Sequence, residues 1–461
     1  MKINDLVSDI EGNLEVENLR IQKFGKSFQI YPWLKGRLFH KYMMGTDVLM
    51  QKSKSVLFSQ VTSLFYGWWN IFRKYNTWVF TNSSERTLVE GKYYDKLFDY
   101  IGNNSKKKTL LIELRLFNKF PKKQVASKYV ISKSLFILVE EVYARFLIGK
   151  IKIENEFLIP ELEKKLECSV SVKEITRKYL AQYRMMQFWL KILPKPKVVY
   201  LTVSYSNFGY IRAFKEKGIK VIEMQHGLIG LGHYAYYYRK NFEAIQFPDE
   251  IGVFGNREVA FFENETVFPI KKATALGRYI LDFYNNKSTE STEVSTICVS
   301  LQDGDLGDKL VRFLIEANGF LKKSYKFIIQ PRRTSENHYR SLFEFPDNFS
   351  FSSQSIYETI ANTDLHITIF STTAIEALSI GKPNILVNIE GKSKEFLGEM
   401  LSDNEFTNFV DTKEEFCDIL DNLKVNSKDS IALSNNLNVK CDYKKNVNTL
   451  IERIENEYIE K

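Results

Sequence analysis

Residues 366–386 decide the fold and read HITIFSTTAIEALSIGKPNIL. An apolar strand is predicted over 367–370, and three hydroxyl residues follow it at 371–373. A helix then begins at once, and Gly-Lys-Pro at 381–383 ends it before a second apolar strand at 384–387. This order of strand, helix and strand predicts a βαβ unit of a parallel sheet.

The start of this helix predicts an anion site. Its first N–H groups have no partner within the helix and can hold a diphosphate beside Ser371, Thr372 and Thr373. Glu376 lies one turn further on, where a carboxylate could accept hydrogen bonds from a ribose. The alternative is that the hydroxyls only cap a structural helix, which is a common role for such residues.

The run from Ser371 to Pro383 resembles the donor-binding segment of GT-B glycosyltransferases. In that family the acid of this helix, here Glu376, typically binds the ribose of the donor. Many retaining members carry a second acid eight residues earlier, where this chain has Thr368. The resemblance implies an α/β fold with two Rossmann-like domains of GT-B type.

A second motif is Gln225-His226-Gly227, which ends an apolar strand and begins a glycine-rich loop. His226 could act as a base or a donor near neutral pH, or it could be a structural histidine. Glu223 and Gln225 alternate along the strand and can share one face. The motif resembles segments of bacterial capsule and lipopolysaccharide glycosyltransferases, which implies catalytic roles for His226, Glu223 and Gln225 and a donor contact for Gly227.

Three further segments are candidate ligand contacts. Gln330-Pro-Arg332-Arg333 follows a strand and resembles the donor-contacting strand end of sialyltransferase-like GT-B enzymes. Its arginines could neutralise phosphate or form a solvated basic turn. Tyr234 and Arg239 belong to an aromatic and basic tract that could hold an acceptor sugar. Ser83 lies in a polar turn that could also touch the acceptor, and each of these segments reads equally well as a plain loop.

The charge and cysteine content of the chain argue against several classes of function. The net charge of +9 is spread along the chain without a nucleic-acid-binding motif, so no nucleic-acid partner is expected. Four scattered cysteines predict neither a disulfide framework nor a zinc site. The turn Asp303-Gly304-Asp305 precedes a helix and needs no metal. The resemblance to GT-B enzymes, which generally work without a bound metal, implies neither a metal nor another cofactor. We expect a cytoplasmic location, because the chain begins without the apolar core of a signal peptide.

One stretch leaves membrane contact open. Residues 55–72 contain no charge and carry large side chains at helical spacing, with Lys and Arg on both flanks. Such a helix could lie at the inner membrane surface. The alternative, which we prefer, is an ordinary helix packed on the core.

The order of predicted elements divides the chain into three parts. Residues 1–75 read as a helical extension, 76–285 as an acceptor-side Rossmann-like domain, and 286–461 as a nucleotide-sugar-binding domain. A helix is also predicted near 93–101.

The resemblance implies transfer of a sugar from a CMP- or UDP-linked donor to a growing or lipid-linked bacterial surface polysaccharide. A teichoic-acid-type CDP-alditol phosphotransferase and a sugar-nucleotide 2-epimerase remain alternatives. So does a non-catalytic, membrane-associated scaffold of capsule assembly.

Overall fold

The computed structural model forms two compact units. Unit 1 comprises residues 1–253, 257–275 and 444–461, and unit 2 comprises 254–256 and 276–443. The residues that the structure describes are 3–44, 58, 60–89, 91–105, 108–114, 122–146, 148–332, 334–424 and 426–459.

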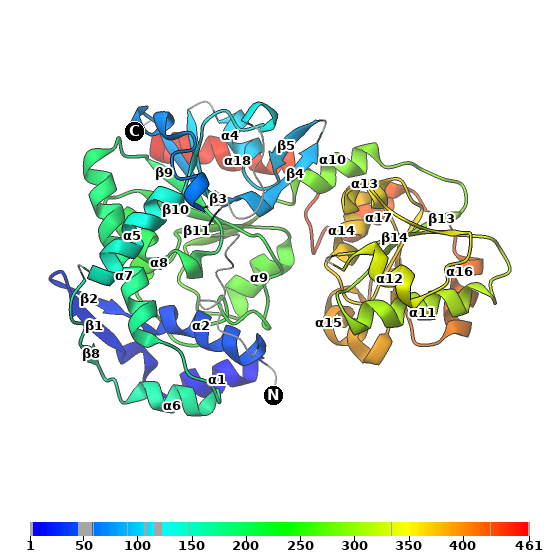
Figure 1. The fold of residues 1–461 in the computed structure, drawn as a ribbon, viewed down its shortest axis with the longest axis horizontal. Coiled ribbons are helices and arrows are strands. Elements are labelled where there is room, and N and C mark those ends of the chain that lie inside the picture. Colours follow the sequence, from blue (N-terminus) through cyan, green and yellow to red (C-terminus); the bar gives the residue numbers. More distant parts are fainter. Residues whose placement is uncertain are drawn as a thin grey trace. The chain divides into compact units, whose positions relative to one another are not determined.

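Unit 1 is built on a seven-stranded parallel sheet with the order β12-β11-β10-β9-β3-β6-β7 (Figure 1). From β3 the chain moves outward to β6 and β7, returns to β9 beside β3, and continues in the opposite direction. The strand order therefore reverses between β3 and β9. The strands are β3 (Thr77–Asn82), β6 (Thr109–Leu114), β7 (Val130–Ser132), β9 (Val198–Leu201), β10 (Lys220–Met224), β11 (Glu250–Val253) and β12 (Lys272–Ala275).

Three helices of unit 1 pack side by side next to its sheet. Helices α5 (Ser134–Phe146) and α7 (Val172–Ile192) pack together, and α7 packs in turn on α8 (Phe208–Lys215) (Figure 1). Aromatic side chains fill the contact between α5 and α7, where the ring centroids of Phe136 and Trp189 lie 5.1 Å apart. Burial of such large apolar surfaces fixes the helices against one another.

The N-terminal segment contains the expected helices α1 (Ile3–Asn13) and α2 (Tyr31–Met44), together with a hairpin that the sequence did not predict. Strands β1 (Arg20–Lys23) and β2 (Lys26–Gln29) pair antiparallel, and β8 (Ile153–Glu154) joins β1. Phe24 and Gly25 form the two-residue turn with φ of 53° and 70°. Two consecutive positive φ values are typical of the two-residue hairpin turn that usually has the sequence Asn-Gly. Because this turn has Phe-Gly instead, the sequence did not indicate a hairpin.

The stretch over 55–72 is not one continuous helix. Residues 55–57 and 59 lie outside the described part, and Gly67 interrupts the rest with φ of 71° before a 3-10 helix, η3 (Trp68–Phe72). A Cβ at Gly67 would lie 1.9 Å from the Val130 carbonyl oxygen, so only glycine fits there. Across the described ranges, we find no helix with the length and apolarity that crossing a bilayer requires.

The prediction of a helix near 93–101 is wrong. Residues 86–95 form a hairpin of β4 (Arg86–Val89) and β5 (Lys92–Asp95), and the helix α4 (Asp99–Asn104) starts later. Buried Asp95 explains the shift, because its carboxylate accepts hydrogen bonds from the N–H groups of Leu97 and Phe98 at 2.9 Å and turns the chain there.

Unit 2 carries a six-stranded parallel sheet with the order β15-β14-β13-β16-β17-β18. Here the order reverses between β13 and β16. The strands are β13 (Thr296–Ser300), β14 (Lys326–Gln330), β15 (Phe349–Phe351), β16 (Leu365–Thr368), β17 (Asn384–Val387) and β18 (Thr407–Val410).

Helices alternate with the strands of both parallel sheets, so the chain is an α/β protein with two Rossmann-like domains. The units differ from the expected domains at several places. Residues 1–75 belong to unit 1 rather than to a separate extension, and residues 254–256 belong to unit 2. Unit 2 begins at Leu276 rather than at residue 286, and residues 444–461, with most of helix α18 (Tyr443–Ile454), belong to unit 1.

Candidate functional site

The hydroxyl turn of unit 2 lies where its strand order reverses. It connects β16 to helix α14 (Thr373–Ile380), and β16 pairs with β13. Open parallel sheets bind ligands beyond the carboxyl ends of their strands at such a reversal. The Thr373 hydroxyl lies 2.7 Å from that of Ser300, which ends β13, so the two strand ends are tied together at this point.

A buried chain of hydrogen bonds decides which way the Thr373 hydroxyl points. The Asn384 amide donates to the Ala374 carbonyl at 2.8 Å, so its oxygen faces His366 Nδ1, also at 2.8 Å. Burial lowers the pKa of His366 to about 4, so the ring is neutral and carries its proton on Nδ1. Nε2 then accepts from Ser300 at 2.8 Å, and Ser300 accepts from Thr373. The hydroxyl proton of Thr373 is therefore donated to Ser300 and is not available to a ligand.

The other two hydroxyls differ in their surroundings. Ser371 Oγ accepts a hydrogen bond from the N–H of Thr373 at 3.3 Å. Thr372 is exposed, has helical backbone angles, and makes no side-chain cap. The capping interpretation thus describes Ser371, whereas Thr372 presents its hydroxyl to solvent at the start of α14.

Glu376 is buried and paired. Its Oε1 forms an ion pair with Arg278 Nη1 and lies 3.4 Å from the Tyr357 hydroxyl. Arg278 precedes helix α10 (Tyr279–Lys287), and its guanidinium lies 4.8 Å from the centre of the Phe254 ring. The sequence analysis missed Arg278, because a single arginine after a glycine carries no recognisable pattern.

The basic strand end is only partly described. Gln330 ends β14, and its Oε1 accepts from the Thr359 hydroxyl at 3.1 Å, which fixes its orientation. Arg332 is exposed, and Arg333 lies outside the described residues. Near β13, Asp305 pairs with Lys309 at 2.5 Å. Among the described residues we find no cluster of three His, Cys, Asp or Glu side chains suited to a metal ion.

In unit 1, Gln225 shapes the loop that carries His226. The Gln225 side chain is buried and donates to the Gly227 carbonyl at 2.9 Å and to Glu258 at 3.0 Å. Its own N–H bonds to Gly252 at 2.9 Å. Gln225 therefore positions the loop from inside the domain.

His226 is half-buried beyond the end of β10. Burial lowers its pKa below the usual value, so the imidazole is neutral at pH 7. Neither ring nitrogen hydrogen-bonds to another described residue. A neutral imidazole with open nitrogens can accept a proton from a ligand hydroxyl. Gly227 next to it has open space where a Cβ would stand.

Glu223 faces the core and joins two segments. Its Oε1 accepts from the Ser204 N–H at 2.9 Å and from the Tyr236 hydroxyl at 2.6 Å, and burial raises its pKa. Val203, beside Ser204, has φ of 56°, which is a strained conformation for a β-branched residue. The carboxylate therefore holds a strained strand end in place.

The candidate acceptor contacts have structural surroundings. The Tyr234 ring stacks on Phe39 at 5.7 Å, and Ser83 is buried in η4 (Ser83–Glu85). The three tyrosines that follow Tyr234 and Ala235 are core residues rather than a sugar-binding surface. Arg239 is exposed, and its backbone N–H donates to Glu11 at 2.6 Å.

Sequence reasoning missed a cavity of about 720 Å³ in unit 1, at the reversal between β3 and β9. Its lining includes Lys133, Glu140, Gln182 and Tyr210, which sit on or next to helices that read as ordinary core helices. In the structure Lys133 directly follows β7 and Asn207 lies in the turn after β9, which are positions where parallel sheets carry binding residues.

Comparison with known proteins gives similarities at the level of solved structures. No protein-family model and no curated protein matches the sequence. A UDP-N-acetylglucosamine 2-epimerase aligns with TM-score 0.49 and 10% identity over 84% of this chain and 97% of that chain. The calicheamicin glycosyltransferase aligns with TM-score 0.48 and 11% identity over 83% and 98%. A wall teichoic acid polymerase aligns with TM-score 0.43 and 12% identity over 94% and 100%.

Proposed function

We propose that the chain is a glycosyltransferase. It would move a sugar from a UDP- or CMP-linked donor to a growing or lipid-linked bacterial surface polysaccharide, without a bound metal ion. The observation that carries the proposal is the place of the hydroxyl turn, at the strand-order reversal of unit 2 and at the start of α14. A nucleotide phosphate placed there would lie at the positive end of the α14 helix dipole, beside the exposed Thr372 hydroxyl.

Unit 2 would bind the donor. The exposed Thr372 hydroxyl and Arg332 would contact the phosphates, while Thr373 would only hold the turn in shape. Arg278 keeps one oxygen of Glu376, so the ribose would be bound by the other, Oε2, which no other described residue engages by a hydrogen bond.

Unit 1 would supply the base. An acceptor hydroxyl would attack the anomeric carbon of the donor sugar, its proton would pass to a ring nitrogen of His226, and the nucleotide would leave with the electrons of the broken glycosidic bond. Gln225 and Glu223 would act by positioning the loop and its surroundings, since both side chains are buried.

Nucleotide binding tests the donor site directly. We expect UDP or CMP at a hundredfold excess over Kd to stabilise the protein by about 2.7 kcal/mol in a thermal-shift screen with UDP, CMP, CDP and GDP. Arg332→Ala should weaken this shift, because the variant loses a phosphate contact. Arg312→Ala, an exposed arginine of helix α11 (Asp305–Asn318), is the matched control and should behave as the wild type. Equal shifts for the two variants would remove Arg332 from the site.

The released product separates the alternatives. A glycosyltransferase releases UDP or CMP, an alditol-phosphate transferase releases CMP while phosphate moves to the acceptor, and an epimerase releases neither. A scaffold would keep its function in His226→Ala and Glu376→Ala. Full complementation of a capsule-negative strain by both variants would therefore contradict any enzymatic role.

Membrane contact forms a separate part of the proposal. Phe65, Trp69 and Phe72 are 70%, 87% and 73% exposed, and Arg73 and Lys74 follow them. Exposed aromatic rings beside cations suit the surface of an anionic bilayer.

We expect Phe65→Ser/Trp69→Ser to reduce sedimentation with phosphatidylglycerol vesicles several-fold. Phe320→Ser removes a ring that is 69% exposed in unit 2 and should leave sedimentation unchanged. Vesicle binding that persists in the double variant would show that these rings do not contact the membrane.

A further inference from the structure

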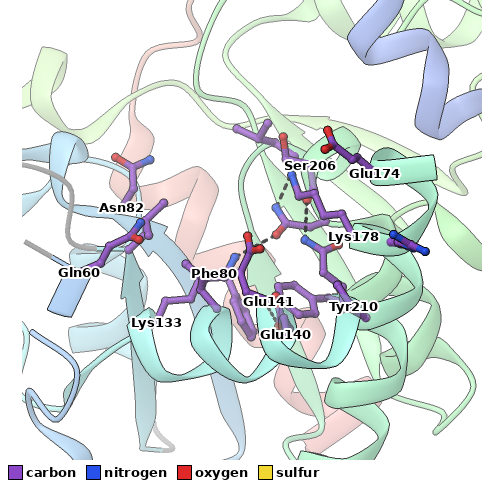
Figure 2. Close-up of a pocket in the computed structure, with 18 of the residues that line it drawn as sticks. Gln60, Phe80, Asn82, Lys133, Glu140, Glu141, Glu174, Lys178, Ser206 and Tyr210 are labelled. Carbon is purple, nitrogen blue, oxygen red and sulfur yellow. Dashed lines mark hydrogen bonds between the residues drawn. The ribbon is translucent and has the colours of Figure 1, made fainter. Parts of the chain in front are cut away.

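The cavity of unit 1 has the place and size of a ligand site. It lies beyond the carboxyl ends of β3 and β9, where Asn82 and Val203 line it, and α5 and α7 form its walls (Figure 2). Its volume of about 720 Å³ falls within the range of about 300–1,000 Å³ that is usual for small-molecule pockets. None of the residues discussed below belongs to the donor site in unit 2.

Lys133 brings an incompletely paired cation to this cavity. Its Nζ donates to Asn207 Oδ1 at 3.2 Å and lies over the rings of Tyr210 at 4.6 Å and Phe80 at 5.5 Å (Figure 2). An ammonium group has three N–H donors. Asn207 is the one hydrogen-bond acceptor that the described residues offer it, so two N–H groups remain for a ligand.

The nearest buried acid does not satisfy Lys133 directly. Glu140 accepts a hydrogen bond from the Tyr210 hydroxyl, and no ion pair joins it to Lys133 among the described residues. Burial raises the pKa of Glu140 to about 7 and lowers that of Lys133 to about 8. The raised pKa of Glu140 favours its protonated form, which repels an incoming anion less than a carboxylate does.

Gln182 supplies a second unsatisfied group. Its side chain lines the cavity, is 4% exposed and donates to the Ser206 carbonyl at 3.1 Å. Its Oε1 is buried and has no hydrogen-bond partner among the described residues. Buried amide oxygens without a partner are costly, and a hydroxyl donor from a ligand would remove that cost.

We infer that this cavity binds a sugar that carries a negatively charged group, with Lys133 pairing with the anion and Gln182 Oε1 accepting from a sugar hydroxyl. The open N–H groups of Lys133 require an acceptor, and the open oxygen of Gln182 requires a donor. A sugar carboxylate or sugar phosphate provides both. As the acceptor subsite of the transfer this inference rests on the proposed function, but as a binding site it rests on the cavity alone.

Three probes with the same sugar ring test the charge requirement. Binding of methyl β-glucuronide, glucose 1-phosphate and methyl β-glucoside to the full chain is measured by calorimetry or ligand-observed NMR. We expect at least one charged probe to bind ten times or more tightly than the neutral glucoside, and the stronger of the two shows whether the anion is a carboxylate or a phosphate. Equal affinities for all three, or no binding by either charged probe, would overturn the inference.

Variants locate the binding. Lys133→Met should abolish the preference for the charged probe, Lys133→Arg should retain part of it, and Gln182→Leu should weaken all three probes. Lys191→Met, an exposed lysine of α7 outside the cavity lining, is the charge-matched control. A Lys133→Arg variant that binds like Lys133→Met while remaining folded by circular dichroism would show that the cation is not the anion partner.

The pH dependence adds a readout that a purely structural lysine would not give. Lys133 pairs with an anion only when protonated, so affinity for the charged probe should fall as pH rises through about 8, and affinity for the glucoside should not. The ionisable groups nearest Lys133 are Glu140 and Tyr210. The same lining also carries the charged side chains of Glu141, Arg145, Glu174, Arg177 and Lys178. Thermal stabilisation by UDP or CMP is measured on the same variants and should equal that of the wild type if only the cavity is affected. This control separates failure of the cavity site from failure of the donor site.

Discussion

Replacing His226 by glutamine is expected to lower kcat by about 10²–10⁴-fold, the usual contribution of a general base. Glutamine keeps a polar side chain in the loop but cannot take a proton from the acceptor. Gln225 should still hold the loop through Gly227 and Glu258, so KM for the donor should change little. Initial rates of nucleotide release, measured with the donor identified by thermal shift, give both constants.

The pH profile of the wild type checks the same assignment. The base must be neutral to act, and burial lowers the pKa of His226, so activity should be lost only below the usual pKa of histidine, about 6.5. The acid limb should disappear in His226→Gln. His338→Ala, which alters a partly exposed histidine bonded to Asp308, is the control and should keep both rate and profile. A glutamine variant with kcat within threefold of the wild type would exclude His226 as the base.

Replacing Arg278 by methionine is expected to destabilise unit 2 by about 3–5 kcal/mol. The two side chains of the Arg278–Glu376 pair are each 9% exposed, and removing one partner leaves a charge buried without its counter-ion. The first transition in urea, followed by fluorescence and by circular dichroism, reports the change. Lys309→Met removes an exposed partner of Glu390 and should cost no more than about 1 kcal/mol.

The double variant Arg278→Met/Glu376→Leu separates stability from binding. Two apolar side chains often replace a buried ion pair at little cost, so most of the lost stability should return. Nucleotide binding should not return, because the ribose acceptor is gone. A double variant that is stable and still binds the nucleotide with wild-type affinity would remove Glu376 from the donor site.

Much of the fold could be predicted from local sequence. Residues 366–387 alternate apolar runs, a hydroxyl turn and a Gly-Pro stop, and the structure has the strand, helix and strand in that order, with the first strand ending two residues earlier. The second predicted strand, at 384–387, matches β17 (Asn384–Val387) at both ends. Such elements are recognisable because a buried parallel strand is almost entirely apolar.

The rest depended on contacts that local patterns do not encode. The hairpin at Phe24-Gly25 lacks the usual turn residues, and Gly67 ends an apparent helix because Val130 passes close to it. Lys133 and Gln182 are ordinary residues in sequence, and only the packing of α5 and α7 brings them to one cavity. Arg278 likewise meets Glu376 across 98 positions of the chain.

Glu223 links the two parts of unit 1 that we assign to chemistry and to recognition. One oxygen of this carboxylate holds Ser204, next to the cavity-lining Val203, and also Tyr236, whose ring lies 4.8 Å from that of His233 in the glycine-rich loop. A ligand that displaces the strained strand end must alter that shared hydrogen bonding, and so the free energy of the loop. Energetic linkage of this kind is reciprocal, so a ligand in the cavity and a ligand at the His226 loop would change each other's affinity by the same factor.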